Sequence, residues 1–436
     1  KNWRPRLDKS DVFIEALRAE LKEAAAAGRP AAVGAARHSM GGQSLPKDGV
    51  AMTFNGISLE PDTARKTYRV NAGARWSEVI AALDPIGFSP AVMQSNHDFG
   101  VASTFCVNAH GWPAPYGPFG TTVRSLRLML ADGSVLECSR TQNAELFGLA
   151  MGGYGLLGVI IDLVVDMTPN LLLAPRHETM AAEEFGEKFA RAVETDASVK
   201  MAYGRLNVAK KSFFEKALIV TYRATPDQPA RLPATTTAGA MTGLSNKIYR
   251  AQIGSEAAKN ARWFAETVAN PRLGSGRATR NTLMNEPVSN LPNLDRRRTD
   301  ILHEYFVPPN RLSDFIGKCR AIIPPARAEF LNITLRYVGA DPVSVLAFAP
   351  AARIAGVMSF SQEITPEGET DMIETTEKLI DAVTDVGGAF YLPYRLHARR
   401  DQVRRAYANA ATFVERKRHY DPKLLFRNAM WDAYFA

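Results

Sequence analysis

The feature that most constrains this chain is a glycine-rich stretch, GAARHSMGGQS at residues 34–44, which continues an apolar run at residues 31–36. Small residues at the end of a buried strand let backbone amides approach a ligand closely, and a phosphate is the usual anion bound by such amides. The stretch therefore predicts a strand that ends in a phosphate-binding turn. A glycine-rich turn alone does not define a family, so the rest of the chain has to supply the context.

Composition places the chain among folded globular proteins. Its 436 residues, 46% hydrophobic and 22% charged, are enough for two domains with separate cores. The net charge of +8 is spread along a chain in which acidic residues accompany the basic ones, which favours a solvated surface over an anionic partner. The densest basic stretch, residues 394–428, has the spacing of an amphipathic helix. An anionic cofactor or a membrane surface is an alternative partner for it, and nucleic acid is not expected.

Cysteines and apolar runs exclude two further classes. Cys106, Cys138 and Cys319 are far apart and form no paired motif, so neither a disulfide framework nor a metal site is expected. The longest apolar run is interrupted by Asp162 and Asp166 and is too short for a membrane span. We therefore expect a soluble or peripheral protein. The compartment, cytoplasmic or periplasmic, is not readable because the chain does not begin with methionine.

Periodicity predicts a mixture of helices and strands. A helix is expected over residues 10–28, a hairpin around the Ala131-Asp132-Gly133 turn, and a long apolar strand before residue 169. Beyond residue 169 we expect a helical stretch over 247–269, followed by strands within 302–338 and 354–364. This mixture predicts the α+β class, with a second domain built on a sheet.

Four segments in this order resemble the FAD-linked oxidases of the vanillyl-alcohol oxidase type. They are GAARHSMGGQS, GVASTFCVNAHG at 100–111, the region 116–160 with its MGGYGLLGVI ending, and YDPKLLFRNAMWDAYF at 420–435. The motifs are most similar to those of sugar-lactone and alditol oxidases and of decaprenyl-phosphoryl-ribose oxidase. The resemblance implies a two-part PCMH-type FAD-binding domain, residues 1–168 with a returning C-terminal segment 394–436. It also implies an inserted α+β substrate (cap) domain on an antiparallel sheet, residues 169–393.

The resemblance also implies which residues hold FAD. The glycine turn would lie against the pyrophosphate, and His38 would carry the flavin covalently, with a histidine packed against noncovalent FAD as the alternative. Cys106 is not favoured as a second attachment point, because the corresponding cysteine of doubly linked relatives falls earlier in the chain. The implied cofactor-binding residues are Gly34, Ala35, Ala36, Arg37, His38, Ser39, Met40, Gly41, Gly42, Gln43, Ser103, Thr104, Asn108, His110, Gly111, Gly155, Gly158, Val159 and Ile160.

The resemblance also implies residues on the substrate side of the cofactor, and they lie on two predicted strands. In the relatives a strand near the end of the substrate domain carries an aromatic residue and then a lysine that faces the flavin. Here Tyr391 and Tyr394 take those places, and Arg395 is the candidate for the missing cation. Arg336 matches a substrate-facing arginine, although Thr334 stands where the sugar-alcohol branch has a glutamate. Glu304 is a further candidate acid, for which we favour a surface or structural role.

The implied function is FAD-dependent oxidation of a CH–OH group by hydride transfer to flavin N5. The donor would be a sugar, polyol, sugar lactone or lipid-linked sugar, and the electrons would pass to oxygen or another acceptor. A dehydrogenase of an amine or a carbon–carbon bond is an alternative, as is a flavin-binding protein without turnover. Peripheral membrane contact is a further open alternative.

Overall fold

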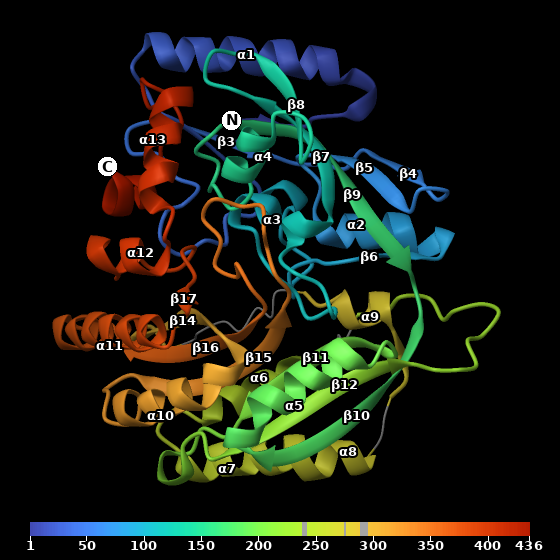
Figure 1. Ribbon diagram of the computed structural model, residues 1–436, viewed down its shortest axis with the longest axis vertical. Helices are drawn as coiled ribbons and strands as arrows, with labels where there is room; N and C mark the ends of the chain where they lie inside the picture. Colours follow the sequence, from blue (N-terminus) through green and yellow to red (C-terminus); the bar gives the residue numbers. More distant parts are fainter. Residues whose placement is uncertain (238–241, 274–275, 288–294) are drawn as a thin grey trace.

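The computed structural model describes residues 1–237, 242–273, 276–287 and 295–436, and its described strands form three sheets (Figure 1). The smallest sheet has the order β1-β3-β2 with parallel pairing. The second joins β4-β5-β9-β7-β8, and β6 also pairs with β9. The strands of these two sheets are β1 (Asn2–Trp3), β2 (Ala31–Gly34), β3 (Val50–Phe54), β4 (Leu59–Asp62), β5 (Thr67–Asn71), β6 (Phe88–Pro90), β7 (Val123–Met129), β8 (Val135–Ser139) and β9 (Val159–Pro169).

The third sheet has eight strands, all paired antiparallel, in the order β13-β10-β12-β11-β15-β16-β14-β17. Their bounds are β10 (Leu172–Ala181), β11 (Val199–Leu206), β12 (Lys216–Ala224), β13 (Ala278–Thr279), β14 (Arg298–Val307), β15 (Glu329–Val338), β16 (Arg353–Glu363) and β17 (Ala389–Phe390). In Figure 1 this sheet occupies the lower half of the molecule, and the other two sheets occupy the upper half.

Helices surround these sheets. Helices α5, α10 and α11 pack on the eight-stranded sheet, whereas α1 and α2 belong to the core of the upper half. The α-helices are α1 (Ser10–Ala26), α2 (Trp76–Leu83), α3 (Val101–Val107), α4 (Ala144–Ala150), α5 (Ala182–Thr195), α6 (Thr242–Ala251), α7 (Glu256–Phe264), α8 (Asn270–Leu273), α9 (Arg280–Met284), α10 (Leu312–Ile322), α11 (Pro366–Asp385), α12 (Arg400–Ala406) and α13 (Ala410–Tyr420). No described helix is both long enough and apolar enough to cross a membrane.

Strand β14 shows how the large sheet separates a core from a cavity. Successive side chains of a strand point to opposite faces. Ile301 and Tyr305 are buried in the core with α10 and α11, where the Tyr305 ring lies 5.7 Å from the ring of Phe315. Leu302 and Glu304 point to the opposite face and line a cavity. One strand therefore contributes to both the packing of the lower half and the site described below.

The C-terminal segment returns to the N-terminal sheets. The amide of Ala31 donates to the carbonyl of Leu425 at 2.7 Å, and the amide of Ala429 donates to the carbonyl of Gly42 at 3.2 Å. In Figure 1, α12 and α13 lie along one side of the molecule, close to the sheets of the upper half. The C-terminal segment thus holds both β2 and the glycine-rich stretch that follows it.

The mixed α+β class and the antiparallel sheets predicted from the sequence are present. The helix predicted over 10–28 is α1, and the predicted hairpin is the antiparallel pair β7 and β8. The stretch 247–269, expected as one amphipathic helical stretch, is divided, since α6 ends at Ala251 and α7 begins at Glu256. Gly254, between them, has a φ of +71°, which interrupts the helical path.

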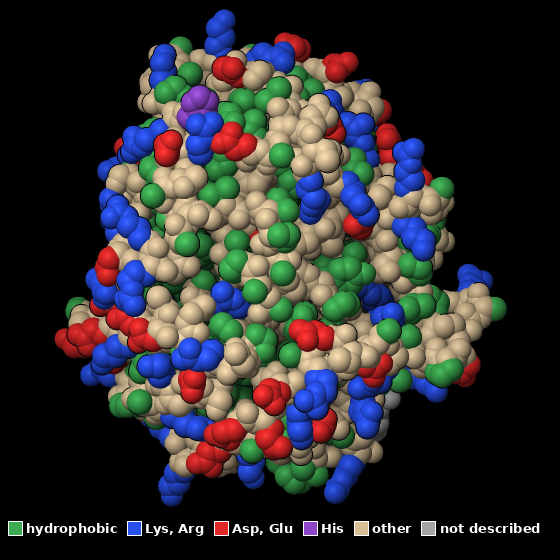
Figure 2. Space-filling view, viewed as in Figure 1, with side chains coloured by type: hydrophobic (Ala, Val, Ile, Leu, Met, Phe, Trp, Pro, Cys, Tyr) green, Lys and Arg blue, Asp and Glu red, His purple; other side chains and the backbone are tan. Residues whose placement is uncertain are grey.

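The division into residues 1–168, 169–393 and 394–436, with a PCMH-type arrangement, remains our proposal. It rests on the change of sheet between β9 and β10. Figure 2 shows basic and acidic side chains interspersed on the face in view, the pattern of a solvated surface.

Candidate functional site: a cavity between the glycine-rich stretch and the large sheet

One cavity of about 360 Å³ connects the glycine-rich stretch to the large sheet. This volume lies in the range of ligand sites, about 300–1,000 Å³. Its walls come from five parts of the chain that are far apart in sequence. These parts are residues 33–44, residues 94–110, residues 154–160, the strands β14 to β16, and residues 391–394.

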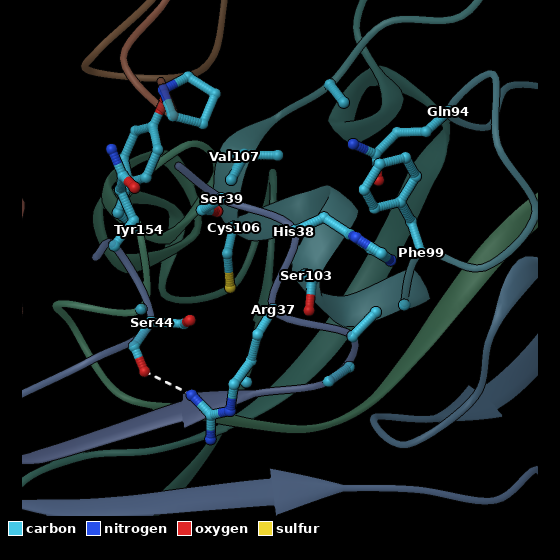
Figure 3. Close-up of a pocket in the computed structure, with 18 of the residues that line it drawn as sticks. Arg37, His38, Ser39, Ser44, Gln94, Phe99, Ser103, Cys106, Val107 and Tyr154 are labelled. Carbon is cyan, nitrogen blue, oxygen red and sulfur yellow. Dashed lines mark hydrogen bonds between the residues drawn. The ribbon is translucent and has the colours of Figure 1, made fainter. Parts of the chain in front are cut away.

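Arg37 explains how the glycine-rich stretch is shaped. Its φ is 55°, in the left-handed region that glycine adopts most easily. The guanidinium offsets this strain, because it donates to the carbonyls of Ser44 at 2.5 Å and Met52 at 2.8 Å (Figure 3). A Cβ at Gly34 would lie 2.7 Å from Nη1 of Arg37, so a side chain there would displace the arginine from this position.

Gln43 ties this stretch to the segment that carries the two candidate tyrosines. Its Oε1 accepts from the amide of Gly41 at 2.8 Å, and its Nε2 donates to the carbonyls of Leu392 at 2.8 Å and Tyr394 at 3.0 Å. The amide of Met40 donates to the carbonyl of Pro393 at 3.0 Å. These bonds fix the two ends of the cavity relative to each other.

His38 lies in the cavity wall with its ring edge-on to Phe99, the centroids 4.7 Å apart (Figure 3). Neither ring nitrogen makes a hydrogen bond to a residue that the structure describes. Burial lowers the pKa of His38, an effect that Asp98 opposes and Arg75 reinforces. The imidazole is therefore favoured in its neutral form, which keeps a nitrogen lone pair.

Residues 154–160 form a second backbone wall. Gly155 has a φ of +71°, and a Cβ there would meet no atom within 4 Å, so glycine leaves the cavity open. Tyr154 also adopts a positive φ, and its side chain lines the cavity beside Cys106 (Figure 3). Burial raises the pKa of the Cys106 thiol to about 12, so this sulfur is protonated near neutral pH.

The sheet end of the cavity holds a buried carboxyl group with several polar partners. Glu304 on β14 is 4% exposed, and its Oε2 accepts from the hydroxyl of Tyr394 at 2.9 Å. Its Oε1 contacts Nε2 of His110, whose Nδ1 lies 3.3 Å from the carbonyl oxygen of Gly111. Arg336 on β15 also lines the cavity. The prediction that Glu304 lies at the surface is wrong, because this side chain is buried and lines the cavity.

The electrostatics of this end follow from burial. Burial raises the pKa of Glu304 to about 7, although Arg336 and the bond from Tyr394 oppose the change. Burial, reinforced by Arg336, lowers the pKa of His110 to about 3, and burial lowers that of Arg336 to about 10. At neutral pH the cluster thus combines a neutral imidazole, a cationic guanidinium and a carboxyl group close to its ionisation point.

The two remaining substrate-side candidates differ in position. Tyr391 lines the cavity, and its hydroxyl donates to the carbonyl of Val107 at 2.7 Å. Arg395 does not line the cavity. Its Nη2 donates to Thr299 at 2.9 Å and its Nη1 lies 3.9 Å from Glu369. The structure therefore does not bring Arg395 to the place of the missing lysine.

Most sequence-predicted residues meet in this cavity. Those that line it are Gly34, Ala35, Ala36, Arg37, His38, Ser39, Met40, Gln43, Ser103, His110, Gly155, Gly158, Val159, Ile160, Arg336, Tyr391 and Tyr394. Those that do not line it are Gly41, Gly42, Thr104, Asn108, Gly111 and Arg395. Two of the second group support its walls. Thr104 accepts from Trp76 at 2.9 Å, and Asn108 accepts from the amide of Gly120 at 2.9 Å.

Among the cavity residues that were not predicted as site residues, or were given another role, are Glu304, Tyr154 and Gln94. Glu304 had a readable signal, since it lies at an alternate position of a strand opposite the core residues. Tyr154 lies within a glycine-rich run, which indicates a tight backbone but not the direction of the side chain. Gln94, in the cavity wall, has no local signal in the sequence.

The residues present fit FAD. Small side chains and exposed backbone line one end, and the buried Oγ of Ser95 there has no hydrogen-bond partner among the described residues. At the other end the buried Nε of Arg336 likewise has no partner within the described part of the chain. Buried polar atoms normally have partners, so these two atoms indicate a polar ligand that spans the cavity.

Comparison with known proteins gives the same assignment. Residues 14–139 match the family model of an FAD binding domain. The chain is 32% identical over 142 residues to alditol oxidase of Streptomyces sp. (strain IKD472 / FERM P-14339), 32% of this chain and 34% of that protein. It is 32% identical over 115 residues to L-gulonolactone oxidase of Mus musculus, 26% of each chain. It is 27% identical over 170 residues to mitochondrial L-galactono-1,4-lactone dehydrogenase of Brassica oleracea, 37% of this chain and 28% of that protein.

The cavity, its orphaned polar atoms and the matched domain together define an FAD-binding protein. Residues 14–139 are an FAD binding domain by this match, and the similarity to an alditol oxidase and to two enzymes of sugar lactones supports the resemblance to the PCMH-type FAD-binding proteins of the vanillyl-alcohol oxidase superfamily. The matched segments span only about a quarter to a third of the length of these relatives.

Proposed function

We propose that the chain is an FAD-dependent oxidoreductase that oxidises a CH–OH group of a sugar, a polyol or a sugar lactone. The observation that carries this proposal is the single cavity that joins the glycine-rich stretch to Glu304, Arg336 and Tyr394. The names of the relatives, an alditol oxidase and enzymes of sugar lactones, support the donor class. A lipid-linked sugar as the donor remains a prediction. Contact of the protein with a membrane surface also remains a prediction.

Bound FAD would supply the hydride acceptor for this oxidation. Residues 34–40 and 155–160 would hold the cofactor with backbone amides and small side chains. At the sheet end, the guanidinium of Arg336 would bind a donor oxygen, since its Nε is buried without a partner among the described residues. Tyr391 and Tyr394 would shape the donor pocket, and their hydroxyls already donate to Val107 and Glu304.

The cofactor would be attached covalently through His38. The neutral imidazole, free of hydrogen bonds to described residues, supports this assignment. The test is precipitation of the purified protein with acid. We expect yellow flavin in the pellet of the wild-type protein and in the supernatant for His38→Ala. Yellow colour in the wild-type supernatant would contradict covalent attachment and leave the FAD site intact.

The proposed reaction is tested by mixing the protein with candidate donors under argon while the flavin absorption is recorded. We expect bleaching by at least one polyol, sugar or sugar lactone. Bleaching only by amines or by donors of a carbon–carbon bond would replace the proposal with that alternative. A flavin that no donor bleaches would indicate a flavin-binding protein without turnover. Hydrogen peroxide formation in air would then decide whether oxygen is the acceptor.

A further inference from the structure

Oxidation of a CH–OH group requires a group that accepts the hydroxyl proton, and the residues named above leave that group open. The phenols of Tyr391 and Tyr394 are unsuited, because burial raises their pKa values well above the usual range. His110 is unsuited by geometry. Its Nε2 contacts Glu304 and its Nδ1 faces the carbonyl of Gly111, so neither nitrogen is free for a donor. At the sheet end of the cavity these contacts leave Glu304 as the acceptor candidate, since His38 lies in the glycine-rich stretch and is assigned to the cofactor.

We propose that Glu304 is a catalytic residue that accepts the hydroxyl proton of the donor, with His110 and Tyr394 as positioning residues. This inference rests on the proposed function. Each oxygen of the Glu304 carboxylate has one protein partner, and a carboxylate oxygen can accept more than one hydrogen bond. The side chain is buried and faces the cavity, so a spare lone pair is available to a bound hydroxyl.

The register of the sheet places this acceptor beside the donor-binding cation. Glu304 pairs with Val357, and Val357 pairs with Thr334, which lies two positions before Arg336 on β15. Val357 lines the cavity between the two strands. Glu304 also acts on the pKa of Arg336 through its charge. A donor oxygen held by Arg336 would thus have its hydroxyl group close to the carboxylate of Glu304.

His110 can support both protonation states of Glu304. When Glu304 is protonated, its O–H can donate to the lone pair of Nε2. When Glu304 is ionised, the other imidazole tautomer presents an N–H to the carboxylate and gives up its Nδ1–H bond to the carbonyl of Gly111. A neutral histidine therefore stabilises the carboxyl group before and after proton transfer without changing its own charge. This is the property expected of a positioning residue.

The proposed step balances. The donor carbon loses a hydride and its hydroxyl loses a proton, so that the alcohol becomes a carbonyl compound. Bound FAD would accept the hydride with its electron pair and would thereby be reduced. The O–H bond breaks and a new O–H bond forms on the carboxylate of Glu304. Bulk water then removes this proton before the next donor reacts.

The groups that face Glu304 determine its pH dependence. They are His110 after α3, Arg336 on β15, Tyr391 and Tyr394 after β17, Tyr154 before β9, and Tyr407 after α12. Among these, Arg336 and the hydrogen bond from Tyr394 favour the ionised carboxylate. Burial opposes them, and the bleaching rate should therefore rise with pH through a step at about 7.

The test compares Glu304→Gln with the wild-type protein in donor-driven bleaching under argon. Because an amide cannot accept the proton, we expect a rate about 10²–10⁴-fold lower, with loss of the pH step and a smaller change in donor affinity. Glu178→Gln, an exposed glutamate on β10 of the same sheet, is the matched control and should retain both rate and pH step. A Glu304→Gln protein that retains the wild-type rate and step would overturn the proposal.

Tyr394→Phe is the second variant and keeps the carboxyl group. Because the lost hydrogen bond favours the ionised form, its pH step should move to a higher pH. An unmoved step would contradict the positioning role of Tyr394.

Infrared titration gives a readout that is independent of turnover. The wild-type protein should show a carboxyl group that ionises near pH 7 and is missing in Glu304→Gln. A Glu304 that stays protonated at the pH of turnover would rule out its role as acceptor. If no donor bleaches the wild-type flavin, the proposed function fails and the assignment fails with it. Bleaching that persists in Glu304→Gln overturns the assignment alone.

Discussion

The two ends of the cavity are built from different kinds of groups. The end formed by residues 34–44 and 155–160 consists of backbone and small side chains, with glycines where a Cβ would collide or fill space. The sheet end consists of charged and aromatic side chains from separate strands, held by specific hydrogen bonds. Backbone suits a large cofactor with phosphate groups, whereas positioned side chains suit the selection of a small donor. The comparison teaches that cofactor binding and donor chemistry can be altered separately.

The largest expected effect comes from filling the backbone end. Gly155→Val adds a branched side chain where the φ is +71° and the cavity is open, so the purified variant should contain little or no flavin. Gly254→Val is the matched control, since Gly254 has the same φ, no atom within 4 Å of its Cβ position, and no place in the cavity wall. Visible absorption per chain measures the effect. Equal flavin loss in both variants would assign it to backbone strain instead of the cavity.

The next effect concerns the donor at the sheet end. Arg336→Met keeps most of the side-chain volume and removes the charge, so donor affinity should fall by roughly 10–100-fold, the value of a charge-assisted hydrogen bond. Flavin content should not change. Donor titration of the bleaching rate gives the affinity, and Arg336→Lys should recover part of it. Loss of flavin in Arg336→Met would contradict the claim that donor binding and cofactor binding can be altered separately.

A smaller effect is expected where the two ends are joined. Gln43→Ala removes the three hydrogen bonds to Gly41, Leu392 and Tyr394, and should lower the free energy of unfolding by about 1–3 kcal/mol. Gln142→Ala, an exposed glutamine near the β8 turn, should have almost no effect. Chemical denaturation of both variants measures the difference. Equal stability in the two variants would show that Gln43 does not join the ends.

A further effect is the pH dependence of stability. The unfolded carboxyl group of Glu304 has its ordinary pKa of 4.5 and the folded one a pKa of about 7, so between these values the folded state holds the extra proton. The stability of the wild-type protein relative to Glu304→Gln should therefore fall as the pH rises from about 4.5 to about 7. Denaturation curves across this range measure the slope, and a rising difference would contradict the raised pKa.

The backbone end could be predicted from the sequence because its signal is local. Glycine spacing after an apolar strand identified residues 34–43, and most of them line the cavity. The order of motifs gave the resemblance to a family of FAD-linked oxidases. Strands β14 to β16 were predicted from strand-like runs, and their antiparallel pairing was implied by that resemblance. The direction of the Arg37 side chain could not be predicted, because it is set by hydrogen bonds of the guanidinium to the carbonyls of Ser44 and Met52.

The sheet end could be predicted only in part, because its geometry is not local. Glu304 lies 194 positions from His110 and 90 from Tyr394, and tertiary packing brings the loops that carry His110 and Tyr394 to strand β14. Sequence order placed Arg395 next to Tyr394 but could not show that its guanidinium turns to Thr299. The break at Gly254 was missed because one glycine within a helical pattern is often tolerated.

The most direct test of the account is the flavin content of the purified wild-type protein, measured from its visible spectrum and by mass spectrometry of the cofactor. The account predicts stoichiometric FAD, either bound on purification or taken up when FAD is added. A folded protein that shows no flavin absorption and does not take up added FAD would contradict the assignment of the cavity.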